Sequence, residues 1–95
     1  MKLNWNLLNM ACYSIEIKKP AQKALLSLPA PIVKQISKLI DSLRDNPLPN
    51  GCKKLSGTDN AYRVRVGDYR IVYTIIKNRL IIEIIKIGHR KDVYR

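Results

Sequence analysis

Residues 61–87 contain three strand-like segments separated by two very short turns, and this spacing constrains the fold more than any other feature of the chain. Gly67 and Asp68 form a two-residue turn with glycine in the first central position, as a type II′ hairpin requires. Residues 77–79 supply a second short reversal. The pattern predicts an antiparallel meander of three strands, which are Ala61–Val66, Tyr69–Ile76 and Leu80–Ile87.

The third segment differs from the other two because it is apolar on both faces. Glu83 and Lys86 are its only charged residues. A nearly continuous apolar run is typical of a strand in the interior of a sheet or covered on both faces. We therefore expect this segment to be a central strand of the sheet or a strand that is covered on both faces.

The N-terminal half predicts one strand followed by two helices. Residues 13–18 alternate as a strand does, and Pro20 and Pro31 each suit the first turn of a helix. Two prolines and an Asn-Gly pair within residues 47–51 then end the second helix. The apolar stripes of the two helices are Ala21, Ala24, Leu25 and Leu28, and Ile32, Val33, Ile36, Leu39, Ile40 and Leu43.

These elements predict an α+β fold in the order β-α-α-β-β-β, with two N-terminal helices packed on one face of a small, mainly antiparallel, twisted sheet. A chain of 95 residues has room for one core, so residues 13–95 are interpreted as a single domain. Residues 1–12 are interpreted as an N-terminal extension. The first nine of these are either a disordered segment or an artefact of start-codon choice.

The chain is strongly basic, with 18 Lys and Arg against 7 Asp and Glu and a formal net charge of +11. Self-repulsion of this kind opposes compaction, and a polyanion or an acidic protein relieves it. We therefore expect a nucleic-acid, ribosomal or acidic-protein partner. A basic surface that only keeps the protein soluble is the simpler alternative.

The inventory of reactive residues excludes several classes of protein. Cys12 and Cys52 stand far apart without other ligands beside them, so no metal or cofactor site is predicted. The four glycines are too scattered for a phosphate-binding loop, and the carboxylates form no convergent pair. The two cysteines indicate reduced thiols. With no convincing export signal and no apolar run of membrane length, we expect a cytoplasmic protein without a membrane partner.

Alternation within the meander gathers arginine side chains on one face of the sheet. Arg63 and Arg65 share one face of their strand, and a tight hairpin brings Arg70 to the same side. Arg90 and Tyr94, after the third strand, can complete the group. Guanidinium groups and a phenol match a phosphodiester better than a sugar, a peptide or a metal, which predicts a phosphate-handling surface. The alternative is a set of solvated charges that deter edge-to-edge aggregation.

The same segments resemble a known family. Residues 62–66 (YRVRV), 69–73 (YRIVY) and 88–94 (GHRKDVY) are similar to the RelE branch of the RelE/ParE toxin superfamily, and the similarity runs from about residue 13 to residue 95. The resemblance implies a bacterial or archaeal type II toxin, a ribosome-dependent endoribonuclease that cleaves mRNA in the A site of the 70S ribosome. It also implies a cognate acidic RelB-like antitoxin that holds the toxin inactive in a hetero-oligomeric complex.

The resemblance implies roles for individual residues. Arg70 and Arg90 fall on motif arginines of the family, and Tyr94 falls on its C-terminal catalytic tyrosine. Arg63 and Arg65 stand where the best-described members have lysines. Because the pKa of arginine lies above about 12, a general-base role at those two positions does not carry over to this chain.

The implied reaction is a metal-independent attack of the ribose 2′-OH on its own 3′ phosphate. It needs in-line geometry, a stabiliser for the charge of the phosphorane, a base and an acid. We expect Arg70 and Arg90 to stabilise that charge, and Arg63 and Arg65 to hold the scissile and flanking phosphates. Tyr94 is expected to stack on a base or to exchange a proton.

The sequence leaves the proton acceptor open. His89 is a candidate because histidine titrates near neutrality, but alternation points it away from Arg90, which favours a structural or RNA-contacting role. Tyr94, Lys53 and Lys54 are further candidates, and water or the ribosome can also take the proton. The basic side chains expected to bind RNA phosphates are Lys53, Lys54, Lys91 and Arg95.

Two other functions are compatible with these residues. A ParE-like inhibitor of DNA gyrase is a binding protein on the same fold without nuclease activity, although such members generally lack the full arginine and tyrosine set. A non-toxic RNA-binding or ribosome-associated protein is the second alternative.

Overall fold

The computed structural model describes residues 12–89 and Lys91, and its elements follow the predicted order with one addition. The added element is a two-residue strand, which nothing in the sequence indicates because two adjacent lysines show no alternation. The α+β fold class is confirmed. The elements are β1 (Ser14–Ile17), α2 (Lys19–Ser27), α3 (Ala30–Ser42), β2 (Lys53–Lys54), β3 (Ala61–Val66), β4 (Tyr69–Ile76) and β5 (Ile81–His89).

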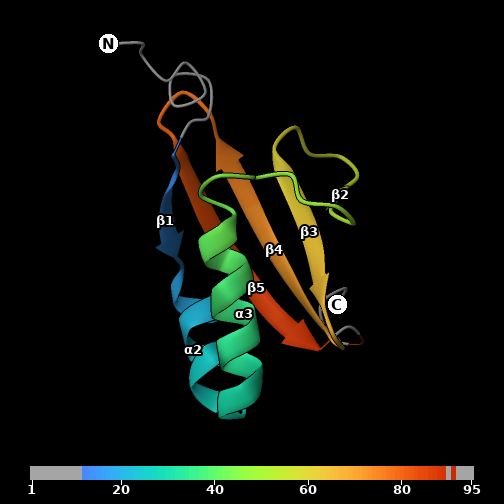
Figure 1. Ribbon diagram of the computed structural model, residues 1–95. Coiled ribbons are helices and arrows are strands. Elements are labelled where there is room, and N and C mark those ends of the chain that lie inside the picture. Colours follow the sequence, from blue (N-terminus) through green and yellow to red (C-terminus); the bar gives the residue numbers. More distant parts are fainter. Residues whose placement is uncertain (1–11, 90, 92–95) are drawn as a thin grey trace, which may run out of the picture.

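All five strands form one sheet in the order β1-β5-β4-β3-β2, and both helices lie on one of its faces (Figure 1). The strand β1 runs parallel to β5, whereas the other neighbours are antiparallel. The strand β5 lies between β1 and β4, so it is an interior strand of the sheet, in agreement with its apolar run. Within residues 12–89 and Lys91, the other face of the sheet carries no helix (Figure 1).

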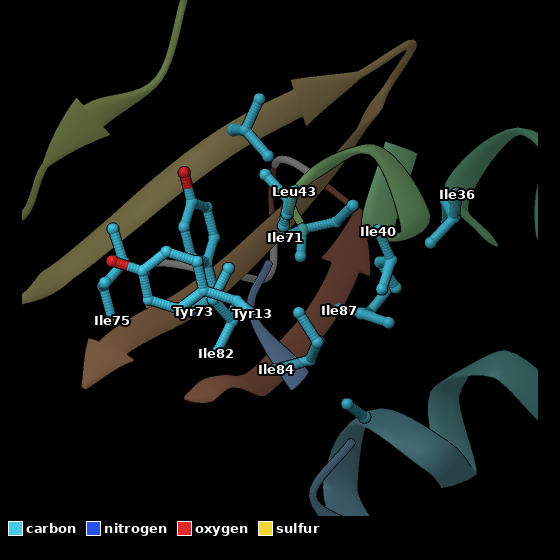
Figure 2. Close-up of a cluster of buried hydrophobic side chains, with 12 residues drawn as sticks. Tyr13, Ile36, Ile40, Leu43, Ile71, Tyr73, Ile75, Ile82, Ile84 and Ile87 are labelled. Atoms are coloured by element: carbon cyan, nitrogen blue, oxygen red, sulfur yellow. The ribbon is translucent and has the colours of Figure 1, made fainter. Parts of the chain in front are cut away.

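The apolar core lies between the two helices and the face of the sheet that they cover (Figure 2). On the second helix, Ile36, Ile40 and the following Leu43 are buried, as the predicted stripe requires. Full burial of a large apolar side chain contributes about 1.5–3 kcal/mol, so this cluster fixes which way each strand faces. The strands contribute Val64, Ile71, Tyr73, Ile75, Ile82, Ile84 and Ile87.

The two reversals of the meander differ in how well the sequence predicts them. Gly67 has φ 59° and Asp68 has no positive φ, which agrees with the expected type II′ turn. The second reversal is one residue longer than expected, because Leu80 adopts a left-handed conformation with φ 53°. The predicted bounds of the third strand are wrong at both ends. The strand begins at Ile81, after the left-handed Leu80, and it continues to His89.

A β-bulge interrupts the pairing of β4 with β5. Val72 pairs with Lys86, whereas the next residue of β4, Tyr73, pairs with Ile84, so Ile85 has no opposite residue. Such an extra residue reverses the alternation on its own strand. In β5 it allows both Ile84, before the bulge, and Ile87, after it, to be buried in the core.

Candidate nucleic-acid interface

The hairpin of β3 and β4 determines where three arginines lie. Its short turn places Arg65 directly opposite Arg70, and Arg63 lies opposite Val72. Residues opposite one another in an antiparallel pair point to the same face. Because Ile71, next to Arg70, is fully buried in the core, the three arginines all lie on the face without helices, as the alternation predicts.

A hollow opens on this face of the sheet. The strand β2 extends the row of side chains by pairing Lys53 with Arg63. The hollow has a volume of about 280 Å³, and none of the described Asp or Glu residues lines it. We call this surface the basic face and define it by Lys53, Arg63, Arg65 and Arg70. The residues that line the hollow are Gly51, Lys53, Arg63, Val64, Arg65 and Arg70.

The three guanidinium groups have different surroundings. Arg65 is exposed, and its Nε donates a hydrogen bond to the backbone oxygen of Gly67 at 3.0 Å, which draws its side chain toward the turn. Arg63 and Arg70 are half-buried, and Nε of Arg70 is itself buried. Arg70 is thus set into the sheet surface, with less rotational freedom than an exposed arginine has.

The same sheet face carries a carboxylate at its other end, on β5. Glu83 lies opposite Thr74, whose Oγ1 donates to Glu83 Oε1 at 3.1 Å, and Lys18 Nζ lies 3.1 Å from Glu83 Oε2. The hydrogen bond from Lys18, followed by that from Thr74, lowers the pKa of Glu83 below its ordinary value of 4.5. This carboxylate is therefore ionised at neutral pH and already engaged by two partners.

A buried tyrosine holds the loop that carries Lys53. Tyr73 is fully buried, and its hydroxyl donates a hydrogen bond to the backbone oxygen of Pro47 at 2.7 Å. Burial, together with the neighbouring Cys52 thiol, raises the pKa of Tyr73 well above its ordinary value of 10.0. This hydrogen bond ties the segment before β2 to β4, so the core fixes the position at which Lys53 meets Arg63.

Comparison with known proteins decides the family. Residues 15–94 match the profile of the family described as ParE toxin of type II toxin-antitoxin system, parDE. The candidate toxin RelE1 of Methanocaldococcus jannaschii is 37% identical over 86 residues, which cover 87% of this chain and 96% of that protein. The chain belongs to the RelE/ParE family of type II toxins. Toxin RelE3 of the same organism is 34% identical over 76 residues, covering 76% of this chain and 84% of that protein.

Solved structures of this toxin family share the fold described above. The RelE–RelB complex of Pyrococcus horikoshii contains a chain that matches with a TM-score of 0.76 and 33% identity, covering 86% of this toxin and 99% of that chain. The isolated RelE toxin of Escherichia coli matches with a TM-score of 0.73 over 86% of this toxin and 90% of that chain. At 24% identity, the second match bears on the fold alone.

Two predicted site residues of the toxin lie away from the basic face. Lys54 pairs with Tyr62, whose ring stacks on buried Tyr73 with the centroids 6.0 Å apart, so Lys54 projects to the side opposite Lys53. The two lysines expected to bind RNA phosphates thus lie on opposite sides of β2, and the role of Lys54 stays a prediction. A loop sequence does not reveal that the two lysines form a strand and must alternate.

His89 also lies on the side of the helices. It pairs with Tyr69, and the two rings meet edge to face with their centroids 5.7 Å apart. Its Nδ1 accepts a hydrogen bond from the backbone N–H of Lys91 at 3.3 Å. Because Arg70 pairs with Gly88, the neighbouring His89 faces away from the basic face.

Three of the predicted site residues lie outside the described residues, namely Arg90, Tyr94 and Arg95. Lys91 is described and exposed. Lys86 was not among the expected site residues, yet the bulge in β5 pairs it with Val72 on the same face as the arginines. The signal for it in the sequence is weak, since it is one of only two charged residues in an apolar run.

The described part of the toxin offers few other reactive groups. Within residues 12–89 and Lys91, no three His, Cys, Asp or Glu side chains are placed so that they could hold a metal ion together. Cys12 and Cys52 are free thiols. Neither of the described helices has the length and apolar character needed to cross a membrane.

Proposed function

We propose that this toxin is a ribosome-dependent endoribonuclease that cuts mRNA in the ribosomal A site and thereby stops translation. The observation that carries the proposal is the basic face, where Lys53, Arg63, Arg65 and Arg70 surround one hollow that no carboxylate of residues 12–89 lines. Such a cluster attracts a polyanion, and planar guanidinium groups can each donate two hydrogen bonds to one phosphate.

The proposed reaction is an intramolecular transesterification of RNA. The ribose 2′ oxygen loses its proton and attacks the adjacent phosphorus, the bond from phosphorus to the 5′ oxygen breaks, and that oxygen gains a proton. The products are a 2′,3′-cyclic phosphate and a 5′-hydroxyl. Arg70 and Arg90 stabilise the negative charge of the phosphorane, while Arg63 and Arg65 hold the scissile and flanking phosphates in line.

Proton transfer in this proposal falls to Tyr94 in preference to His89. The reason is geometric, because His89 lies on the other side of β5 from Arg70, against Tyr69. A histidine base gives a single-turnover rate that rises with pH and levels off near pH 7, whereas a tyrosine or a lysine keeps the rate rising toward about pH 10. We expect Tyr94→Phe to lower the rate more than His89→Gln does.

The contrary outcome is equally specific. If His89→Gln lowers the single-turnover rate by about a hundredfold, the scale of one acid or base catalyst, and abolishes the levelling near pH 7, His89 is the proton-transfer residue. A rate that is insensitive to both substitutions leaves Lys53, Lys54, water and the ribosome as the acceptors of the proton.

The proposed partner that restrains the toxin is an acidic, RelB-like antitoxin. The net charge of +11 favours such a partner, and the similar chain of Pyrococcus horikoshii was solved as a RelE–RelB complex. A ligand that binds only the folded state raises its stability by mass action, so the complex should melt at a higher temperature than the free toxin. Expressed alone, the folded toxin should arrest growth, and full-length folded protein that is harmless contradicts the proposal.

The decisive experiment is primer extension on a translated message after brief induction of the toxin. We expect cuts at defined positions within codons and only where ribosomes occupy the message. In vitro, programmed ribosomes with an open A site should stimulate cleavage, because a few phosphate contacts give weak and salt-sensitive binding to free RNA. Efficient cutting of ribosome-free RNA indicates an autonomous nuclease instead.

Inhibition of DNA gyrase is the second candidate, because the matching family profile is described by the name ParE. The two functions separate in one assay. An intact message together with reduced supercoiling by purified gyrase would establish the ParE-like activity, whereas cut messages and unchanged supercoiling support the nuclease.

A further inference from the structure

We infer that Lys86 is a further RNA-binding residue of this toxin, which holds a phosphate at the edge of the basic face farthest from β2. The inference rests on the proposed function, because it adds a contact to the same RNA site. It goes beyond that function by assigning a role to a residue that family resemblance does not single out, and by extending the site across β4 to β5.

The register of four strands places Lys86 in line with the basic face. Lys53 pairs with Arg63, Arg63 with Val72, and Val72 with Lys86. Side chains in such a row point to one face of the sheet. Two strand spacings separate Lys86 from Arg63, about 10 Å between their backbones. Lys86 therefore stands across Val72 from Arg63, and these two cations flank an apolar residue.

The bulge at Ile85 is what brings Lys86 to this face. If the pairing of Ile84 with Tyr73 continued without the bulge, Lys86 would lie opposite Ile71, which is fully buried in the core. An ammonium group there would be buried without compensation. Bulges occur often next to active sites, where they change the direction of a side chain, and this one turns a lysine toward the proposed RNA site.

The row beside Lys86 leaves room for a nucleotide. Arg65 lies opposite Arg70, and Arg70 lies opposite Gly88, which has no side chain. Gly88 and Val72 thus form a neutral strip between the arginines and Lys86. We place the ribose and base of one nucleotide over this strip, with its flanking phosphates held on either side. A lysine suits such a contact because it is a point charge on a flexible stem.

The carboxylate nearest to Lys86 along β5 is engaged elsewhere. Glu83 accepts a hydrogen bond from Thr74 and lies 3.1 Å from Lys18 Nζ. Lys18 also lies 3.3 Å from Glu16, which pairs with Glu83 across β1 and β5. The two carboxylates and Lys18 therefore mark the far end of the sheet face, beyond Lys86.

The test measures binding of a short single-stranded RNA with 2′-O-methyl groups, which the toxin cannot cleave by 2′-OH attack. The full-length toxin and its variants are titrated at several salt concentrations, and the slope of log Kd against log salt is compared. Removing one phosphate contact reduces that slope by about 0.7 for a single strand. We expect this reduction for Lys86→Gln and for Arg63→Gln, and we expect Lys86→Arg to keep the slope of the unchanged toxin.

Lys38→Gln is the matched control, because Lys38 is exposed on α3, which packs on the other face of the sheet (Figure 1). It removes the same charge and should leave the slope unchanged. If Arg63→Gln reduces the slope and Lys86→Gln does not, the inference about Lys86 fails while the proposed RNA site stands. If RNA binding by the unchanged toxin shows no dependence on salt, both fail. Thermal unfolding of each variant identifies any change that comes from loss of fold.

Discussion

The two faces of this sheet are built from alternate residues of the same strands, yet their chemistry is opposite. One face carries isoleucine and tyrosine and is sealed by the helices, whereas the other carries Arg63, Arg65 and Arg70 and is covered by neither of the two described helices (Figure 1). The first face supplies burial energy, and the second crowds like charges, which is destabilising. The difference teaches that stability and the proposed activity can be altered independently by substituting neighbouring residues.

The largest effect is expected from a charge on the covered face. Ile36→Asp places a carboxylate at a fully buried position on α3, and it should cost more than about 4 kcal/mol of unfolding free energy, enough to unfold the domain. Urea titration followed by circular dichroism measures the loss. Gln35→Asp, at the exposed neighbouring position, adds the same charge and should stay folded. A folded Ile36→Asp variant would show that the helices are not needed to seal this face.

The next effect is on activity and concerns the open face. Arg70→Ala should lower ribosome-dependent cleavage by about 10²- to 10³-fold, the scale for loss of one group that stabilises a transition state. Arg79→Ala, in the exposed loop between β4 and β5, removes the same charge away from the basic face and should keep full activity. Single-turnover cleavage of ribosome-bound message measures both variants. If Arg70→Ala unfolds the protein as Ile36→Asp does, Arg70 is needed for stability, and activity cannot be altered independently of stability at this residue.

A smaller effect is expected from Tyr73, a residue of the covered face whose hydroxyl holds the loop that leads to Lys53. Tyr73→Phe removes the hydrogen bond to Pro47 and should cost about 1 kcal/mol of stability. The raised pKa of Tyr73 adds a pH dependence with a definite sign. The contribution of Tyr73 to stability is fully present below about pH 10 and is lost as pH rises further, because the unfolded chain releases the hydroxyl proton of this tyrosine more readily than the folded chain does. Chemical unfolding from pH 8 to pH 11 should show this loss in the unchanged toxin and not in Tyr73→Phe.

The smallest effect is expected from Glu83. Its pKa is lowered by Lys18 and then by Thr74, so its contribution to stability is present above about pH 4.5 and is lost as pH falls below that value. Glu83→Gln should flatten this part of the pH dependence and leave stability at pH 7 nearly unchanged, because ion pairs near the surface contribute little. Acid titration of the unfolding midpoint tests it. If Glu83→Gln loses stability at low pH as the unchanged toxin does, other carboxylates cause that loss.

Much of the covered face could be predicted from the sequence because it depends on local periodicity. The stripe that contains Ile36 and Ile40 and the glycine turn at Gly67 identify the second helix and the hairpin, and the structure confirms both. The same alternation correctly places Arg63, Arg65 and Arg70 together. These features need only nearest-neighbour geometry.

The features that the sequence did not reveal depend on pairing between strands. The bulge at Ile85 turns Lys86 outward, and an apolar run contains no mark of where a register will shift. Strand β2 forms only because β3 offers it an edge, which separates Lys53 from Lys54. The conformation of Leu80 likewise follows from joining β4 to β5 and not from leucine's own preference.

The parallel pairing of β1 with β5 has a consequence for when this toxin can exist in its folded form. Ser14 lies near one end of the chain and pairs with Ile81 near the other. A ribosome makes β1 early, but β5, with which β1 pairs, is the last of the described strands to emerge. Non-local pairing of this kind is slow, since a long loop must close before any contact compensates for it. The domain therefore completes its sheet only after β5 has been synthesised, which delays the proposed activity until that strand has left the ribosome.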